Sequence, residues 1–166
     1  VNEENYLQVI RYKTAKLFEA ATRLGAILSD VSPEEEESMA SYGMHLGTAF
    51  QLTDDMLDYS GDYHDTGKNL GDDLAEGKPT LPLIYAMKNG SQEQANIVSK
   101  AIQNGGGEGV LESVLKVINE TGALDYTRKK AEAESCMATE AISLLPDSQY
   151  KKCLLQLAVF AVSRNH

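Results

Sequence analysis

Residues 32–59 read SPEEEESMASYGMHLGTAFQLTDDMLDY, and this stretch decides the fold class. Its start is typical of a helix N-terminus, with Ser32 as N-cap, Pro33 at the first helical position and Glu35 three residues after the cap. Apolar residues then recur at helical spacing, which predicts one helix that runs to about Tyr59. We expect its buried stripe to consist of Met39, Tyr42, Leu46, Ala49, Phe50, Thr53 and Leu57.

The opposite face of this predicted helix carries one amide and three carboxylates. Each residue advances about 100° around a helix axis, so Asp54, Asp55 and Asp58 fall within about 60° of Gln51. Like charges at this spacing destabilise a helix, and the dipole disfavours anions near its C-terminal end. A Mg²⁺ ion would remove the conflict, because it binds carboxylate oxygens and bridges them to substrate phosphates. A solvated acidic face is the alternative for this pattern taken alone.

The rest of the chain also favours helices, so the predicted fold class is all-α. We expect a first helix over residues 5–28, with Leu7, Thr14, Leu17 and Leu24 on its apolar stripe. A long loop follows over residues 60–80, and no stretch alternates with the period of a strand. The later helices are expected near residues 81–88, 92–103, 108–120, 123–145 and 148–163. We treat residues 1–166 as a single all-α unit.

Composition and charge limit the class of function. The formal net charge is −10, which disfavours generic nucleic-acid binding because that needs a basic surface. Cys136 and Cys153 form no CxxC motif, so we expect two buried free thiols in a reducing cytosol. From the acidic start we expect no signal peptide, and the apolar run at residues 154–162 is too short to span a bilayer. We therefore predict a cytoplasmic protein, with this run forming a core helix.

Three lysines outside the acidic helix could supply positive charge near its carboxylates. Lys68 and Lys78 each follow a glycine in the long loop, where the backbone can approach a ligand closely and the ammonium can meet a phosphate. Lys13 and Thr14 lie in the middle of the first predicted helix. A solvated loop and a surface lysine are the alternatives for each feature by itself.

The combination of motifs is more specific than its parts. Lys13-Thr14, then Gln51-x-x-Asp54-Asp55-x-x-Asp58, then GKNLGDDLAEGKPTLP at residues 67–82 together resemble the trans-isoprenyl diphosphate synthase family. The long-chain, octaprenyl-forming members look most similar. The resemblance extends over essentially all of this chain, but it corresponds to the C-terminal half of such an enzyme.

The resemblance implies an all-α, isoprenoid-synthase-type bundle around a central cavity, usually in a homodimer. It implies transfer of an allylic diphosphate's prenyl group onto isopentenyl diphosphate, with Mg²⁺ bound together with the substrate diphosphate. Asp54 would be the main metal ligand, with Asp55 and Asp58 in support. The implied diphosphate contacts are Lys13, Thr14, Gln51, Lys68 and Lys78, and the implied catalytic residues are Asp54, Asp55, Lys13 and Lys68. His45, His64 and His166 are expected to be structural or exposed.

The departure from the family pattern is the absence of the first Asp-rich motif and the basic residues upstream of it. We expect a fragment that needs the missing N-terminal half as its partner and has no turnover alone. The product would be an apolar tail for ubiquinone or menaquinone, which would be the protein's only link to a membrane. The open alternatives are a non-catalytic partner subunit and a terpene cyclase, the latter disfavoured by the lysines. Gly43, Met44 and Gly47 would either line the product tunnel or pack helices.

Overall fold

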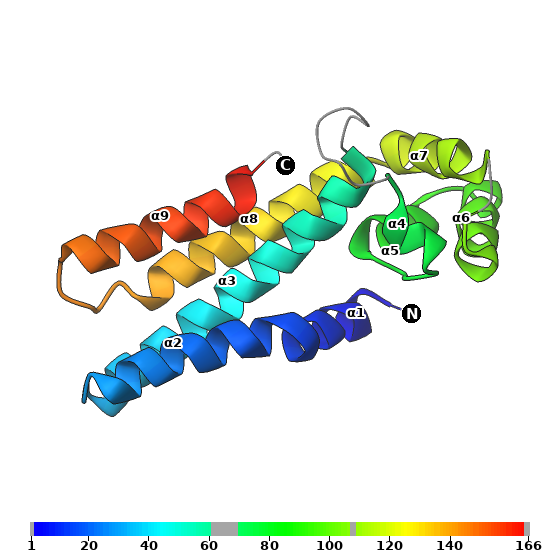
Figure 1. Ribbon diagram of the computed structural model, residues 1–166. Helices are drawn as coiled ribbons and strands as arrows, with labels where there is room; N and C mark the ends of the chain where they lie inside the picture. The colour runs from blue at the N-terminus through cyan, green and yellow to red at the C-terminus, as the bar shows by residue number, and fades with distance from the viewer. Residues whose placement is uncertain (1, 61–69, 107–108, 165–166) are drawn as a thin grey trace. The chain divides into compact units, whose positions relative to one another are not determined.

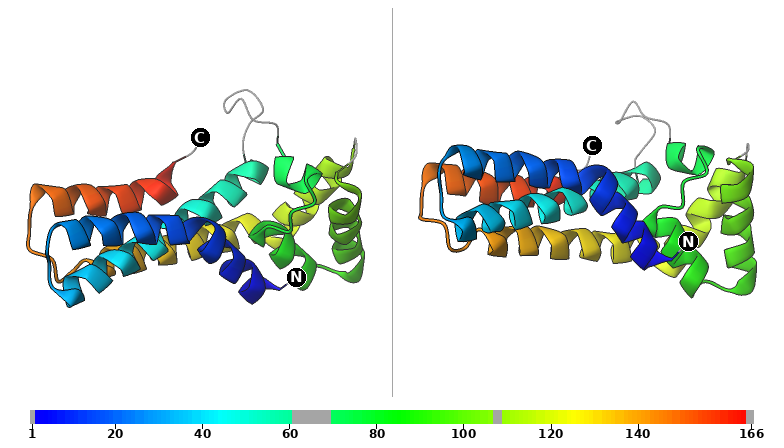
Figure 2. Two further views of the ribbon diagram at one scale, coloured as in Figure 1. Left: turned by 60° about the horizontal axis from the view of Figure 1, so that its bottom comes forward. Right: turned by 90° about the horizontal axis from the view of Figure 1, so that it is seen from below.

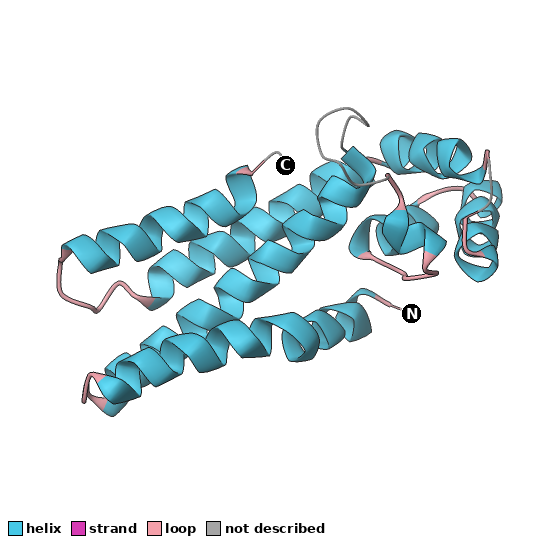
Figure 3. Cartoon of the chain, in the orientation of Figure 1, coloured by secondary structure: helices cyan, strands magenta, loops and turns pink. Residues whose placement is uncertain are grey.

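A computed structural model describes residues 2–60, 70–106 and 109–164, and all regular structure within them is helical (Figures 1 and 3). The all-α prediction is confirmed. The elements are α1 (Glu3–Ile10), a π-helical turn η1 (Arg11–Ala15), α2 (Lys16–Leu28), α3 (Pro33–Ser60), α4 (Asp72–Ala75), α5 (Leu81–Asn89), α6 (Gln92–Asn104), α7 (Val110–Thr121), α8 (Ala123–Ala141) and α9 (Gln149–Ser163). None of the helices in the described ranges is long and apolar enough to cross a membrane.

Helix α3 begins where the capping signal predicts. The Glu35 backbone N–H donates to Ser32 Oγ at 3.2 Å, and the Ser32 N–H donates back to Glu35 Oε2 at 2.9 Å. This reciprocal pair satisfies N–H groups that the first helical turn leaves without partners. The bond from the Ser32 backbone also lowers the pKa of Glu35.

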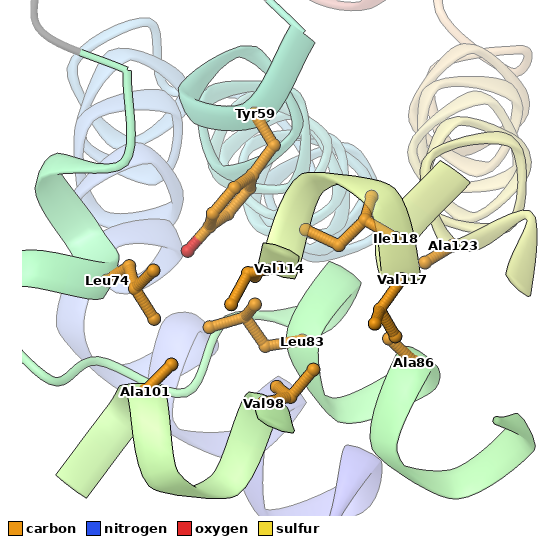
Figure 4. Packing of buried hydrophobic residues seen from close by; sticks show 10 residues of the cluster. All are labelled: Tyr59, Leu74, Leu83, Ala86, Val98, Ala101, Val114, Val117, Ile118 and Ala123. Carbon is orange, nitrogen blue, oxygen red and sulfur yellow. The ribbon is translucent and has the colours of Figure 1, made fainter. Parts of the chain in front are cut away.

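The described residues fall into two compact units. The first contains residues 2–6, 54–60, 70–106 and 109–129. Figure 4 shows its core, where one side chain or more from each of α3 to α8 gathers around a common centre. The core residues are Tyr59, Leu74, Leu83, Ala86, Val98, Ala101, Val114, Val117, Ile118 and Ala123. The single-unit description of residues 1–166 stays a prediction.

The second unit contains residues 7–53 and 130–164, and its ribbon forms the helical hairpins α2–α3 and α8–α9 (Figure 2). Its core consists of Tyr42, Leu46, Ala138, Ile142, Ala158 and Ala161. Side-chain hydroxyls bond to backbone carbonyls between its helices. Tyr42 donates to the Leu154 carbonyl at 2.8 Å, and Ser135 donates to the Ala158 carbonyl at 2.7 Å.

Two glycines let the first part of the chain approach α3 closely. A Cβ atom on Gly43 would lie 2.3 Å from Thr22 Oγ1, and one on Gly47 would lie 2.6 Å from Ala15 Cα. Contacts this short leave no room for a side chain. Of the two roles left open for these glycines, the structure shows helix packing.

The first predicted helix is interrupted, and its predicted apolar stripe is wrong beyond residue 14. Leu17 and Leu24 are 74% and 58% exposed, whereas Ala15 and Ala26 are buried. A π-helical turn holds one residue more than an α-helical turn. The inward face of α2 is therefore shifted by about one residue from the spacing of a continuous helix.

Three further expectations are corrected. Cys136 and Cys153 are free, as predicted, but both are exposed rather than buried. Helix α9 is not buried all round, because it packs through Ala158 and leaves Phe160 61% exposed. Helix α3 is buried beyond its predicted stripe, since Leu52, Asp55 and Met56 are also buried. Apolar periodicity indicates which side chains can be buried, but not how many sides of a helix its neighbours cover.

Candidate functional site

The first group of candidate site residues is the three carboxylates near the end of α3. Because α3 is helical through Ser60, Asp54, Asp55 and Asp58 have the spacing that the sequence predicts. Their surroundings differ, however. Asp55 is only 2% exposed, whereas Asp54 and Asp58 are of intermediate exposure.

Asp55 is held by a tyrosine that lies 49 positions away in the chain. Its Oδ2 accepts a hydrogen bond from the hydroxyl of Tyr6, which is itself 6% exposed. Burial, and then the Asp55 charge, raise the pKa of Tyr6 far above its ordinary value. The hydroxyl therefore remains a donor and fixes the orientation of one of the predicted metal ligands.

Asp58 ties the end of α3 to the loop that follows it. Its Oδ2 accepts from the Asp73 backbone N–H at 3.1 Å, and its backbone carbonyl accepts from the Gly71 N–H at 2.9 Å. Burial, and then the nearby Asp73 charge, raise the pKa of Asp58 to about 6, against the opposing effect of the backbone donors. An acid whose ionised form is disfavoured in this way would be relieved by a bound cation.

Asp73 also connects this acidic cluster to Lys78. The Lys78 ammonium lies 3.2 Å from Asp73 Oδ1 and 2.5 Å from Glu76 Oε2, and bonds to these two carboxylates raise its pKa. Sequence reasoning assigned Lys78 but missed Asp73. The available signal was the pair Asp72-Asp73 between the two Gly-Lys steps of the loop. Lys68 lies outside the described residues.

The second unit brings two predicted diphosphate contacts together. Thr14 Oγ1 donates to Gln51 Oε1 at 2.9 Å, although 37 positions separate the residues. Thr14 and the exposed Lys13 both lie in the π-helical turn. Such turns are rare and often occur at functional sites. Apolar periodicity gave no sign of this turn.

His45 pairs with Glu134 of the same unit, which agrees with a structural role. Its Nδ1 lies 2.6 Å from Glu134 Oε2, and Arg11 lies 3.2 Å from the other oxygen of that carboxylate. His64 and His166 lie outside the described residues.

The carboxylates of α3 are oxygen donors of the kind that Mg²⁺ prefers, but they do not form a closed cage. Within residues 2–60, 70–106 and 109–164, no group of three or more His, Cys, Asp or Glu side chains is arranged to hold a metal ion. Asp55 and Asp58 are each bonded to protein donors. Mg²⁺ commonly binds through one or two carboxylates and completes its shell with water and phosphate oxygens. The assignment of Asp54, Asp55 and Asp58 as its ligands stays a prediction.

Known proteins resemble this chain in both sequence and fold. Residues 1–118 match the profile of the polyprenyl synthetase family. The octaprenyl diphosphate synthase of Escherichia coli (strain K12) is 50% identical over 99% of this chain and 51% of its own length. The all-trans-nonaprenyl-diphosphate synthase (geranyl-diphosphate specific) of Rhodobacter capsulatus is 46% identical over 98% of this chain and 49% of its own length.

A solved structure extends the likeness to three dimensions. A polyprenyl synthase from Caulobacter crescentus CB15, complexed with calcium and isoprenyl diphosphate, matches with a TM-score of 0.93 at 38% identity. The match covers 100% of this chain and 51% of the other. This chain thus spans about half the length of the curated relatives that it matches.

Proposed function

The chain belongs to the polyprenyl synthetase family, and we propose that it forms the second half of a long-chain prenyl diphosphate synthase. The observation that carries this proposal is the family match over residues 1–118, which includes every predicted site residue. The carboxylates of α3 and the Thr14–Gln51 pair supply groups that such a substrate requires, namely ligands for a hard cation and donors for phosphate oxygens.

In the proposed reaction, the carbon–oxygen bond of the allylic diphosphate breaks and the electron pair leaves with pyrophosphate. The double bond of isopentenyl diphosphate then forms the new carbon–carbon bond to the allylic cation. Loss of a proton restores a double bond, and repetition lengthens the chain. The step that needs help is departure of the anion, because negative charge builds up on its oxygens.

Each residue has a proposed part in holding that anion. Asp54 would be the main Mg²⁺ ligand, supported by Asp55 and Asp58. When bound, Mg²⁺ would neutralise charge on the diphosphate. The diphosphate itself would be contacted by Lys13, Thr14, Gln51, Lys68 and Lys78. Lys78 would need to reach it from its present pairing with Asp73 and Glu76.

The product proposed is octaprenyl diphosphate, since the E. coli relative that is 50% identical is named for that chain length. An octaprenyl tail would suit the side chain of a quinone. The enzyme that makes it would be a homodimer in the cytoplasm. The competing product length is nonaprenyl, because the Rhodobacter relative, which is 46% identical, is named for that length.

We further propose that an upstream half of the enzyme completes the site. About half the length of each curated relative lies outside the match. Leu17, Leu24 and Leu28 lie along one side of α2 and are 74%, 58% and 85% exposed. An apolar face of this kind is typical of an interaction surface. The missing half would pack against this face. Without that half to complete the site, this chain by itself would show no turnover.

The test on the chain itself is an NMR titration with inorganic pyrophosphate, with and without Mg²⁺. We expect Mg²⁺-dependent shifts of the backbone amides near residues 51–58, and their loss in Asp54→Asn. Asp147→Asn is the matched control, because it makes the same charge change on a side chain that is 97% exposed. Unchanged binding by Asp54→Asn, or binding that ignores Mg²⁺, would contradict the proposal.

A further inference from the structure

We propose that Glu134 is a positioning residue that fixes the π-helical turn carrying Lys13 and Thr14. The inference rests on the proposed function for its purpose, but its structural basis is independent of it. Glu134 lies on α8, far from any motif that the sequence indicated, and is only 6% exposed. A buried glutamate is unusual unless it is paired, so its partners indicate its role.

The partners of Glu134 lead directly to the turn. Arg11, the first residue of the turn, donates from Nη2 to Glu134 Oε1 at 3.2 Å across 123 positions of sequence. His45 Nδ1 lies 2.6 Å from the other carboxylate oxygen. Each oxygen of Glu134 therefore has its own partner, one from the turn and one from α3.

The turn needs such an anchor. A π-helical turn is an irregularity that a continuous α-helix would remove, so contacts from outside the helix must hold it. The second unit supplies contacts to the first, fourth and fifth residues of the turn. They are the Arg11–Glu134 ion pair, the Thr14–Gln51 hydrogen bond at 2.9 Å, and the packing of the fully buried Ala15 against Gly47.

Among these contacts, Glu134 fixes the start of the turn with a charge. Arg11 is half-exposed and long, and by itself would have many conformations. The buried carboxylate restricts it to one, and Lys13 follows only two residues later. Without the anchor, the extra residue of the turn could move along the helix. The Lys13 ammonium and the Thr14 hydroxyl would then lose their fixed directions.

The experiment compares Glu134→Gln with Glu132→Gln in the 166-residue chain. Both variants remove one negative charge from α8, but Glu132 is exposed. The first readout is the set of ¹⁵N-amide signals of residues 11–15. The second is the affinity for inorganic pyrophosphate with Mg²⁺, by titration. Should Glu134→Gln not fold, Arg11→Lys removes the forked donor from the opposite, half-exposed side of the pair.

We expect Glu134→Gln or Arg11→Lys to shift or broaden the amide signals of residues 11–15, while Glu132→Gln leaves them as in wild type. Pyrophosphate affinity should fall about tenfold, as is common when a residue that orients a binding group is lost. Unmoved signals in residues 11–15 would overturn the proposal, as would moved signals with unchanged affinity. If the wild type binds no pyrophosphate, the proposed function fails, and the amide signals still decide whether Glu134 fixes the turn.

Discussion

The carboxylate end of α3 and the π-helical turn both carry residues proposed to hold a diphosphate, but they are built differently. Asp54, Asp55 and Asp58 owe their common face to regular helical spacing. Lys13 and Thr14 owe their positions to one extra residue in a helix, held by long-range contacts. The first arrangement can be read from local sequence, whereas the second depends on residues elsewhere in the chain.

The largest expected effect comes from Gly47→Ala, which tests whether the turn depends on close packing. The new Cβ would lie 2.6 Å from Ala15 Cα, a backbone atom that cannot move aside cheaply. We expect a loss of about 3 kcal/mol in the free energy of unfolding, because overpacking outweighs the higher helix propensity of alanine. Chemical denaturation measures this change.

Gly25→Ala on α2 is the control for that prediction. A Cβ at Gly25 meets nothing within 4 Å, so only helix propensity should change. We expect a gain of up to about 1 kcal/mol. If both alanine variants were equally stable, close packing of the turn on α3 would not matter for folding.

Tyr6→Phe tests the carboxylate end in the same way. It removes the hydroxyl donor from Asp55, a carboxylate that is 2% exposed. A cost of about 2 kcal/mol is expected, as is typical of a hydrogen bond to a buried charged group. Tyr150→Phe, on a residue that is 83% exposed, should leave the denaturation midpoint unchanged. A midpoint for Tyr6→Phe equal to that of wild type would mean that the bond contributes nothing.

The smallest expected effect is the pH dependence due to Asp58 in the metal-free chain. Its folded pKa of about 6 lies above its ordinary value, so the contribution to stability is complete below about pH 4. That contribution is lost as the pH rises through 6. Because solvent screens a partly exposed group, we expect a fall of about 1 kcal/mol.

The check on this prediction is Asp58→Asn, whose amide oxygen can still accept from the Asp73 N–H. The variant should lack the fall in stability between pH 4 and pH 6. An identical pH profile in wild type and variant would contradict the assignment of that fall to Asp58.

Sequence reasoning succeeded where structure is local. The start of α3 at Ser32 and the acidic face of α3 both follow from spacing within a few turns of helix. It failed where partners lie far apart, as for Tyr6 with Asp55 and Arg11 with Glu134, which are separated by 49 and 123 positions. Periodicity describes one helix at a time and does not specify its tertiary partners.

The π-helical turn shows how a local irregularity propagates. Periodicity predicted Leu17 and Leu24 on the inner face, yet both are exposed because the turn shifts the register of α2. The same shift leaves the row of leucines for which we propose the upstream half as the partner. The exposure of these leucines, which the predicted stripe had placed inside, therefore indicates both the π-helical turn and a candidate interface.

The most direct test of the account is a steady-state assay of the full-length protein from its complete reading frame. Farnesyl diphosphate, isopentenyl diphosphate and Mg²⁺ would be the reactants, and wild type would be compared with Asp54→Asn and Asp147→Asn. We predict that Asp54→Asn lowers kcat/KM by about a hundredfold or more, and that Asp147→Asn matches wild type. If Asp54→Asn kept the wild-type rate, the carboxylates of α3 would not be the metal-diphosphate half of a prenyl synthase.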